Sequence, residues 1–185
     1  MRIALKEWQV LVDAMGRGDL IAMVRKGGIR EQRAGFSVRH ERFLLYPTYF
    51  HEKPAELAPR FIPSLGGSEE PHGTVRFRYV ADVAGLWWVT DLDRLRAIES
   101  HVGLTWSAIE SRFNYRNNPG VHVVALKLSE LPAQVDVEDK PRYRGCVSWV
   151  SLDHPIDVAD ARPVLPSDAL DARVEALTAL LGPAA

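Results

Sequence analysis

The stretch from Asp19 to Glu52 constrains the fold of this chain most. It contains two apolar runs, Leu20–Val24 and Phe43–Tyr46, and both are too short for a typical helix. Runs of this length that are bounded by turn residues are typical of strands buried in a sheet. The stretch therefore predicts two strands that help to form a core.

The residues between and after these runs favour a binding surface. Glycines Gly27 and Gly28 allow either a tight turn or a close approach of the backbone to a ligand. The longer Gly-Lys-Ser/Thr pattern of a phosphate-binding loop is absent. The basic residues of the segment are Arg25, Lys26 and Arg30, and the aromatic residues that follow the second run are Tyr49, Phe50 and His51.

Periodicity predicts the other elements. Apolar residues at helical spacing predict one helix over Ala4–Met15, with Trp8 on its buried face. Thr90, Thr105 and Ser167 are expected to cap three further helices. Strands are expected over residues 36–40, 75–89, 121–128 and 146–152, with Pro47 ending the strand before it and connections over residues 53–71 and 131–143.

The order of these elements indicates the fold class. The strands cluster along the chain and do not alternate strictly with helices, which favours an α+β fold over a doubly wound parallel sheet. We expect one domain over residues 1–185, with a mixed or mostly antiparallel curved sheet, which could close into a barrel, and flanking helices.

Composition excludes several classes of protein. A chain of 185 residues can bury a core large enough to fold without a disulfide or a metal. Its single cysteine, Cys146, excludes an internal disulfide and fits a reducing cytoplasm. No apolar run reaches the ~20 residues of a membrane helix, and Lys6 and Glu7 interrupt the first apolar pattern. We therefore expect a cytoplasmic protein without a membrane partner.

The charge distribution is uneven. The net charge of −1 excludes a globally basic nucleic-acid binder. Residues 17–53 nevertheless carry eight Lys/Arg against four Asp/Glu, and residues 153–175 carry two against six. Such asymmetry favours an anionic partner at one face; the alternative is ordinary variation of surface charge.

Arginines are interleaved with aromatic rings in two clusters, one within residues 25–51 and one formed by residues 112–116 and 142–145. Such a mixture suits contacts to phosphates and stacking on bases. In the alternative interpretation the rings belong to the core and the arginines extend from the sheet edge to solvent. The predicted binding residues are Arg25, Lys26, Gly27, Gly28, Arg30, Tyr49, Phe50, His51, Arg112, Arg144 and Trp149.

Three functions are compatible with these patterns. The first is a module that binds DNA or RNA. The second is an enzyme acting on a nucleotide or nucleic acid, with His40, Glu41 and His51 for acid–base chemistry. The third is an interaction protein without a small ligand. Asp136 and the sequence 138–140 match the spelling of a nuclease metal site, but their flanks indicate a solvated loop, so no metal or cofactor is expected.

Five sequence motifs, LKEW, RKGGIRE, FLLYPTYFH, SRFNYR and YRGCVSW, resemble the prokaryotic family called domain of unknown function 1802 (DUF1802). The resemblance covers Leu5 to about Leu152, which implies a family-like core over residues 1–152 and a C-terminal extension over 153–185 with one helix. Some members look associated with restriction-endonuclease-type domains, which implies a role near restriction–modification. The order of elements over Ala4–Lys26 is also similar to the ASCH/PUA-like superfamily of small barrels that bind RNA or modified bases.

Overall fold

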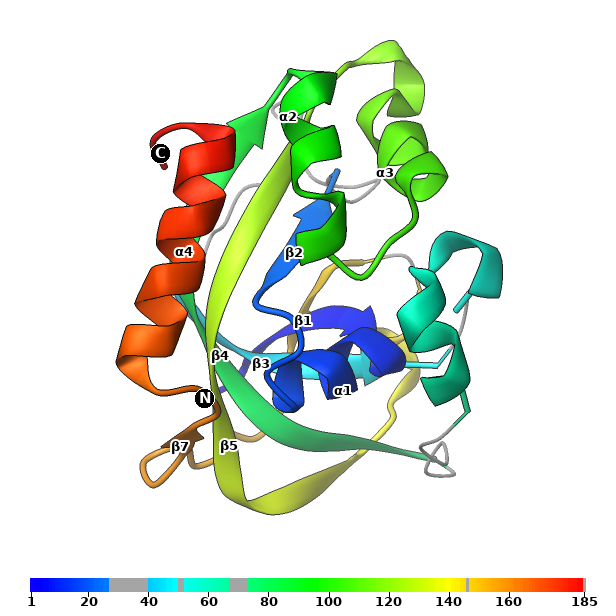
Figure 1. Cartoon of the computed structure of the whole chain (residues 1–185). Coiled ribbons are helices and arrows are strands. Elements are labelled where there is room, and N and C mark those ends of the chain that lie inside the picture. Colours follow the sequence, from blue (N-terminus) through cyan, green and yellow to red (C-terminus); the bar gives the residue numbers. More distant parts are fainter. Residues whose placement is uncertain (27–39, 50–51, 67–72, 146, 185) are drawn as a thin grey trace.

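A long, strongly curved pair of antiparallel strands forms the centre of the fold (Figure 1). In the computed structural model, which describes residues 1–26, 40–49, 52–66, 73–145 and 147–184, β4 (Thr74–Val89) pairs antiparallel with β5 (Val121–Glu138). The register shifts between Phe77 and Tyr79 and again between Val83 and Gly85. Because such bulges bend a strand and increase its twist, the β4–β5 pair curls, and the sheet built on it is curved as well.

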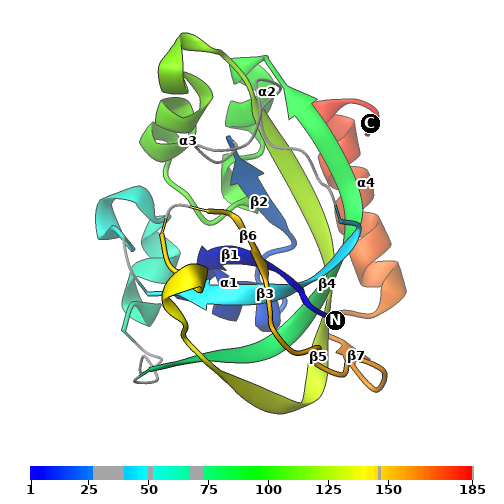
Figure 2. The ribbon, with the colours of Figure 1, turned by 180° about the vertical axis from the view of Figure 1, so that it is seen from behind.

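The remaining strands extend this strand pair into one mixed sheet with the order β2-β5-β4-β3-β1-β6. Only the pairing of β1 with β3 is parallel among the described strands. Figure 2 shows the curled sheet from behind. The added strands are β1 (Ile3–Trp8), β2 (Ala22–Arg25), β3 (Arg42–Thr48), β6 (Trp149–Ser151) and β7 (Arg162–Pro163), the last of which pairs with β5.

Helices flank this sheet. The α-helix α4 runs along β4 and β5, and α2 and α3 lie beside each other at one end of the molecule (Figure 1). The α-helices are α1 (Gln9–Gly16), α2 (Leu92–Ala97), α3 (Trp106–Phe113) and α4 (Ser167–Leu181). Short 3-10 turns are η1 (Pro54–Glu56), η2 (Pro59–Ser64), η3 (Glu99–His101), η4 (Tyr115–Asn117) and η5 (Pro141–Tyr143). The expected single α+β domain with a mixed curved sheet is confirmed.

Apolar residues cover both faces of the sheet. Along β3, Phe43 and Leu45 belong to the larger core, whereas Leu44 and Tyr46 belong to a second core. Successive residues of a strand point to opposite faces, so a strand buried on both sides reads as a continuous apolar run. This explains why the short run over β3 is recognisable from sequence.

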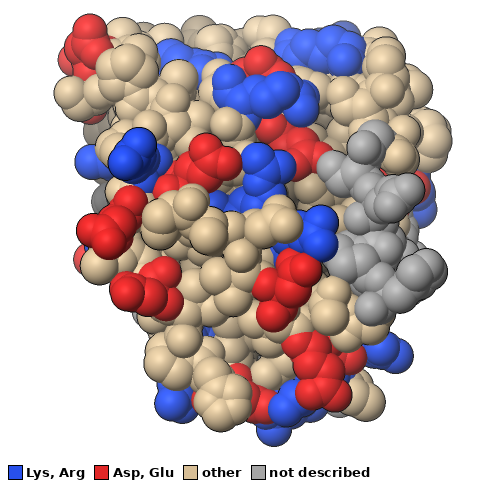
Figure 3. Space-filling view, turned by 90° about the horizontal axis from the view of Figure 1, so that it is seen from below, with Lys and Arg blue, Asp and Glu red and all other residues tan. Residues whose placement is uncertain are grey.

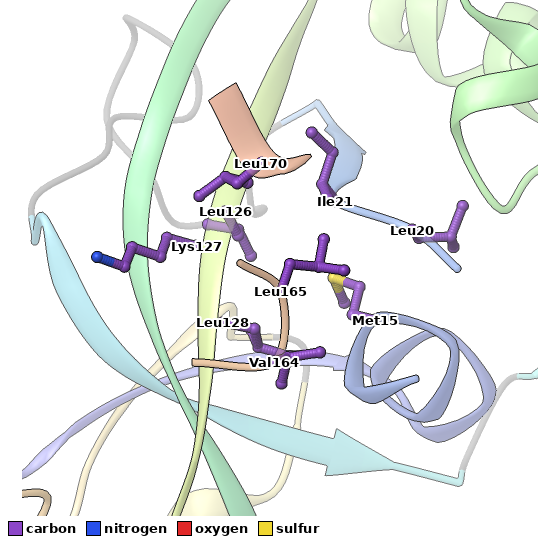
Figure 4. A pocket seen from close by; sticks show the side chains of 9 residues that line it. All are labelled: Met15, Leu20, Ile21, Leu126, Lys127, Leu128, Val164, Leu165 and Leu170. Atoms are coloured by element: carbon purple, nitrogen blue, oxygen red, sulfur yellow. The ribbon is translucent and has the colours of Figure 1, made fainter. Parts of the chain in front are cut away.

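The C-terminal segment closes one side of the larger core. Val164, Leu165 and Leu170 pack toward Met15 and Leu126, and the space among these side chains is an apolar cavity of about 10 Å³ (Figure 4). A cavity of this volume holds one water molecule at most. These side chains therefore form a packed apolar contact between α1, β5 and the start of α4, and not a ligand site.

The structure corrects the prediction of one helix over Ala4–Met15, which is wrong in its first half. Residues Ile3–Trp8 form β1, and only Gln9–Gly16 form α1. Ala4 and Leu5 are buried on opposite faces of the sheet. Pairing of β1 with two neighbouring strands therefore overrides a helical spacing that a short apolar segment also satisfies.

Other boundaries also differ from expectation. Pro47 does not end β3, because the strand continues to Thr48 and Pro47 pairs with Glu7 of β1. The connection expected over residues 131–143 is largely strand, because β5 runs to Glu138 opposite β4. Asp91, and not Thr90, caps α2 by accepting hydrogen bonds from two backbone amides. Most of the strand predicted over residues 36–40 lies outside the described residues.

Candidate functional site

A hollow of about 560 Å³ opens where β1, β2 and β3 end. Because β1 and β3 are parallel and Trp8 lies opposite Thr48, the carboxyl ends of both strands reach the same edge of the sheet. A volume of this size is within the range of small-molecule sites. The lining residues are Lys6, Glu7, Trp8, Val24, Arg25, Lys26, Tyr46, Pro47, Thr48, Tyr49, Thr74, Val75, Arg112, Asp139, Arg144, Gly145, Val147 and Ser148.

The lining combines positive charge with aromatic rings. Five Lys or Arg residues line the hollow against two carboxylates, those of Glu7 and Asp139. Trp8, Tyr46 and Tyr49 supply aromatic surface. An excess of cations in a concave site attracts anions, and the rings offer surfaces on which a flat group can stack.

An ion pair joins β2 to β1 at the wall of the hollow. Arg25 Nη1 lies 3.2 Å from Glu7 Oε2 and donates a hydrogen bond to the backbone oxygen of Lys6 at 3.0 Å. Glu7 Oε1 accepts a hydrogen bond from the amide of Trp8. The two side chains are only 16% and 11% exposed. Arg25 therefore connects β2 to β1 at the wall of the hollow and also adds positive charge there.

A second arginine packs against an aromatic ring. The guanidinium carbon of Arg112 lies 5.4 Å from the centroid of the Trp8 ring, which is cation–π geometry. Arg112 Nη2 also lies 3.6 Å from Glu56 Oε2. Burial lowers the pKa of the Arg112 guanidinium, and the nearby Arg25 acts in the same direction, whereas the carboxylates of Glu7 and Glu56 oppose it.

A hydrogen-bonded chain of three side chains forms the opposite wall. Tyr46 donates from its hydroxyl to Asp139 Oδ1 at 3.0 Å, and Arg144 Nε donates to Asp139 Oδ2 at 2.9 Å. Burial raises the pKa of the Tyr46 phenol far above its usual value, and the hydrogen bond to Asp139 raises it further. Lys6 Nζ donates to the backbone oxygen of Gly145 at 3.1 Å and lies 5.4 Å from the centre of the Tyr46 ring.

Lys26 has a structural task that its position in a basic segment did not indicate. Its ammonium group donates to the backbone oxygens of Phe113, Asn118 and Gly120, which belong to the end of α3 and the turn after it. Burial lowers the pKa of this ammonium group. Because an ammonium group has three donors, these three carbonyls occupy all of them.

The predicted binding residues are only partly gathered in the hollow. Arg25, Lys26, Tyr49, Arg112 and Arg144 line it. Trp149 is not among its lining residues and instead packs edge-on against His40 and Phe43, with ring centroids 5.3 and 5.0 Å away. Gly27, Gly28, Arg30, Phe50 and His51 lie outside the described residues. What these residues bind stays a prediction.

The candidate acid–base residues do not gather at the hollow. His40 contacts Trp149, and Glu41 is exposed just before β3; neither lines the hollow. Within the described ranges, no three His, Cys, Asp or Glu residues lie close enough together to hold a metal ion. Asp136 of the nuclease-like spelling lies on β5 and pairs with Arg76 at 2.8 Å.

Sequence reasoning missed most of the residues that line the hollow, among them Lys6, Glu7, Trp8, Thr48 and Asp139. Lys6, Glu7 and Trp8 were assigned to a helix, although the LKEW motif that contains them was one of the family-like words. Asp139 was expected in a solvated loop, and Thr48, although it lies in the FLLYPTYFH motif, was not among the predicted binding residues. Because these residues meet through the pairing of distant strands, only the family-like motifs LKEW and FLLYPTYFH, which contain four of them, offered a clue.

Away from the hollow, charges of both signs are mixed. On the face seen from below in Figure 3, Lys and Arg residues are interspersed with Asp and Glu residues. Surface ion pairs such as Arg78–Glu130 and Arg42–Asp82 also join charges of opposite sign. None of the helices in the described ranges is long and apolar enough to cross a membrane.

Comparison with known proteins identifies a family. A family model described as "Domain of unknown function (DUF1802)" matches residues 4–176, which extends beyond residue 152 into α4. A search of curated proteins found no match. Among solved structures, a mutant of the ASCH protein from Zymomonas mobilis (ZmASCH) matches with a TM-score of 0.42 and 12% identity over 94% of each chain.

Proposed function

The chain belongs to the DUF1802 family, and we propose that this member is a nucleic-acid-binding module whose hollow holds one unstacked nucleotide of a DNA or RNA strand. The observation that carries the proposal is the meeting of cations and aromatic rings in one concave site of about 560 Å³. Cations bind the phosphates of a nucleic acid, and aromatic rings give its bases a surface on which to stack.

Arg144 is the best candidate for a phosphate contact. Its side chain is 60% exposed, and its Nε and Nη2 atoms are held by the carboxylate and the backbone oxygen of Asp139. The guanidinium group is thus oriented at the rim of the hollow while much of it faces solvent. Lys6, whose ammonium group is bonded to the oxygen of Gly145, adds a second positive charge at the same end.

The aromatic rings of the hollow supply the surface for a base. Trp8 and Tyr49 are both half-buried and line the hollow. Arg112 packs over the Trp8 ring and holds it in place. A base that stacks on a protein ring gains about 1–3 kcal/mol, and because every base has a π face, such stacking tolerates any sequence.

The proposal is tested by binding of labelled single-stranded DNA and RNA of about 12 nucleotides, measured by fluorescence anisotropy at low ionic strength. We expect binding of at least one of the two, with an affinity that falls steeply between about 50 and 200 mM salt. Arg144→Ala should weaken binding about three- to tenfold and reduce the slope of log affinity against log salt by about 0.7.

Arg142→Ala is the matched control. Arg142 is two positions away and similarly exposed, at 57%, but it pairs with Asp153 and does not line the hollow. This variant should bind as tightly as the wild-type protein. Absence of binding to both strands at low salt, or equal losses in the two variants, would contradict the proposed function.

A further inference from the structure

We infer that Trp88, seated on His122, forms a second stacking platform for the strand that leaves the hollow, so that the partner is a single-stranded nucleic acid and not a lone nucleotide. The inference rests on the proposed function and extends it to a surface outside the hollow.

Strand register places this platform in line with the wall of the hollow. Arg25 of β2, which lines the hollow, pairs with His122 of β5, and His122 pairs with Trp88 of β4. Residues directly opposite one another in antiparallel strands share a face of the sheet. Since neighbouring strands lie about 4.8 Å apart, Trp88 is roughly 10 Å from Arg25 across the sheet.

The Trp88 ring is exposed and is also held in place. Its exposed fraction of 44% is unusual for so large an apolar side chain. The ring centroid lies 4.6 Å from that of His122. A Cβ atom on Gly120 would lie 2.4 Å from Trp88 Cζ2, so the indole lies against the bare backbone of that glycine. One side of the ring is therefore supported by protein while the rest remains open to solvent.

Lys26 links this platform to the hollow. Lys26 lines the hollow, and its ammonium group donates at 2.7 Å to the backbone oxygen of Gly120, the residue against which the Trp88 indole packs. Burial lowers the pKa of the His122 imidazole, and the charge of Lys26 lowers it further. A neutral imidazole, inclined at 51° to the indole, packs against Trp88 without adding a charge. One residue, Lys26, thus connects the lining of the hollow to the glycine that supports Trp88.

The position of Trp88 beside the positively charged hollow favours a nucleic-acid strand over a protein partner. An exposed tryptophan can mark either kind of surface. Here the neighbouring concave site carries an excess of Lys and Arg over Asp and Glu, which complements a phosphate backbone. A strand with one base in the hollow would bring its next bases over the Trp88 ring.

The experiment compares two ligands of different length. Adenosine 5′-monophosphate occupies only the hollow, whereas a single strand of about six nucleotides can reach both surfaces. In wild-type protein the strand should bind more tightly than the mononucleotide. Trp88→Ala should weaken binding of the strand roughly tenfold and leave mononucleotide binding unchanged, and Trp88→Phe should retain most of the strand affinity.

Leu180→Ala is the control, because Leu180 is another exposed apolar side chain, on α4; it should leave both affinities unchanged. If neither ligand binds wild-type protein, the proposed function fails and takes this inference with it. If the strand binds wild type and Trp88→Ala equally well, the platform is refuted while the hollow stands. Equal losses for both ligands, or binding of a protein at Trp88 in place of the strand, also overturn the inference.

Discussion

The hydroxyl of Tyr46 donates a hydrogen bond to Asp139 Oδ1 at 3.0 Å, while the other oxygen of Asp139 accepts from Arg144. This relationship ties a buried residue of the second core to an exposed arginine at the rim of the hollow. The aromatic ring of Tyr46 contributes to folding, and its hydroxyl contributes to the site. Removal of one atom, the hydroxyl oxygen of Tyr46, therefore breaks the hydrogen bond that joins Tyr46 to Asp139 in this wall.

We expect Tyr46→Phe to reduce the free energy of unfolding by about 1–2 kcal/mol, because it removes a buried donor and leaves the half-buried Asp139 with one partner fewer. Urea denaturation followed by tryptophan fluorescence measures this change. Tyr115→Phe is the control, since Tyr115 is 43% exposed, and it should change stability by less than about 0.5 kcal/mol. Equal effects of the two substitutions would mean that the bond to Asp139 contributes nothing.

Lys26→Met should also destabilise the protein. The substitution leaves the backbone oxygens of Phe113, Asn118 and Gly120 without their donor. We expect a loss of about 1–2 kcal/mol, at the lower end for bonds to a charged group because the ammonium group is partly solvated. Lys53→Met, which removes one exposed ion pair with Glu56, is the control and should be nearly neutral. Similar losses in both variants would remove the special role of Lys26.

Glu52 predicts a dependence of stability on pH. Its Oε1 accepts a hydrogen bond from the amide of Val10 at the start of α1. Burial raises the pKa of this carboxyl above 4.5, although the bonds from the amides of Val10 and Gln9 oppose the shift. Because the pKa is raised in the folded state, protonation stabilises the fold, and this contribution is lost as the pH rises through the folded pKa.

Glu52→Gln keeps an oxygen acceptor but cannot ionise. The free energy of unfolding of the wild-type protein, relative to this variant, should therefore decrease from about pH 4 to about pH 7. Urea denaturation at several pH values within this range measures the difference. A difference that is constant or increases with pH would show that the buried carboxylate carries no penalty.

Gly120→Ala tests the seat of Trp88. Gly120 has a φ of 126°, which a residue with a side chain rarely adopts, and its new Cβ would meet the indole. We expect a loss of about 1–3 kcal/mol from backbone strain and overpacking. In the Trp88→Ala background the loss should be smaller, because the clash is absent and only the strain remains. Equal losses in the two backgrounds would indicate that the indole is not packed against this glycine.

The sequence alone determined several parts of this protein. The strands over Leu20–Val24 and Phe43–Tyr46 were predictable, because a continuous apolar run of that length is satisfied by a strand buried on both faces. The α+β class followed from the clustering of strands. The alternation of arginines with aromatic residues also singled out Arg112 and Arg144, both of which line the hollow.

Tertiary structure decided the rest. The segment over Ala4–Trp8 is a strand because β3 and β6 pair with it on either side, and no local pattern encodes partners about 40 and 150 residues away. That same pairing creates the hollow by bringing Trp8 beside Thr48. Lys26 holds a turn, because the chain folds three carbonyls around its ammonium group. Local sequence sets which residues can be buried or charged, whereas contacts between distant segments set what each one touches.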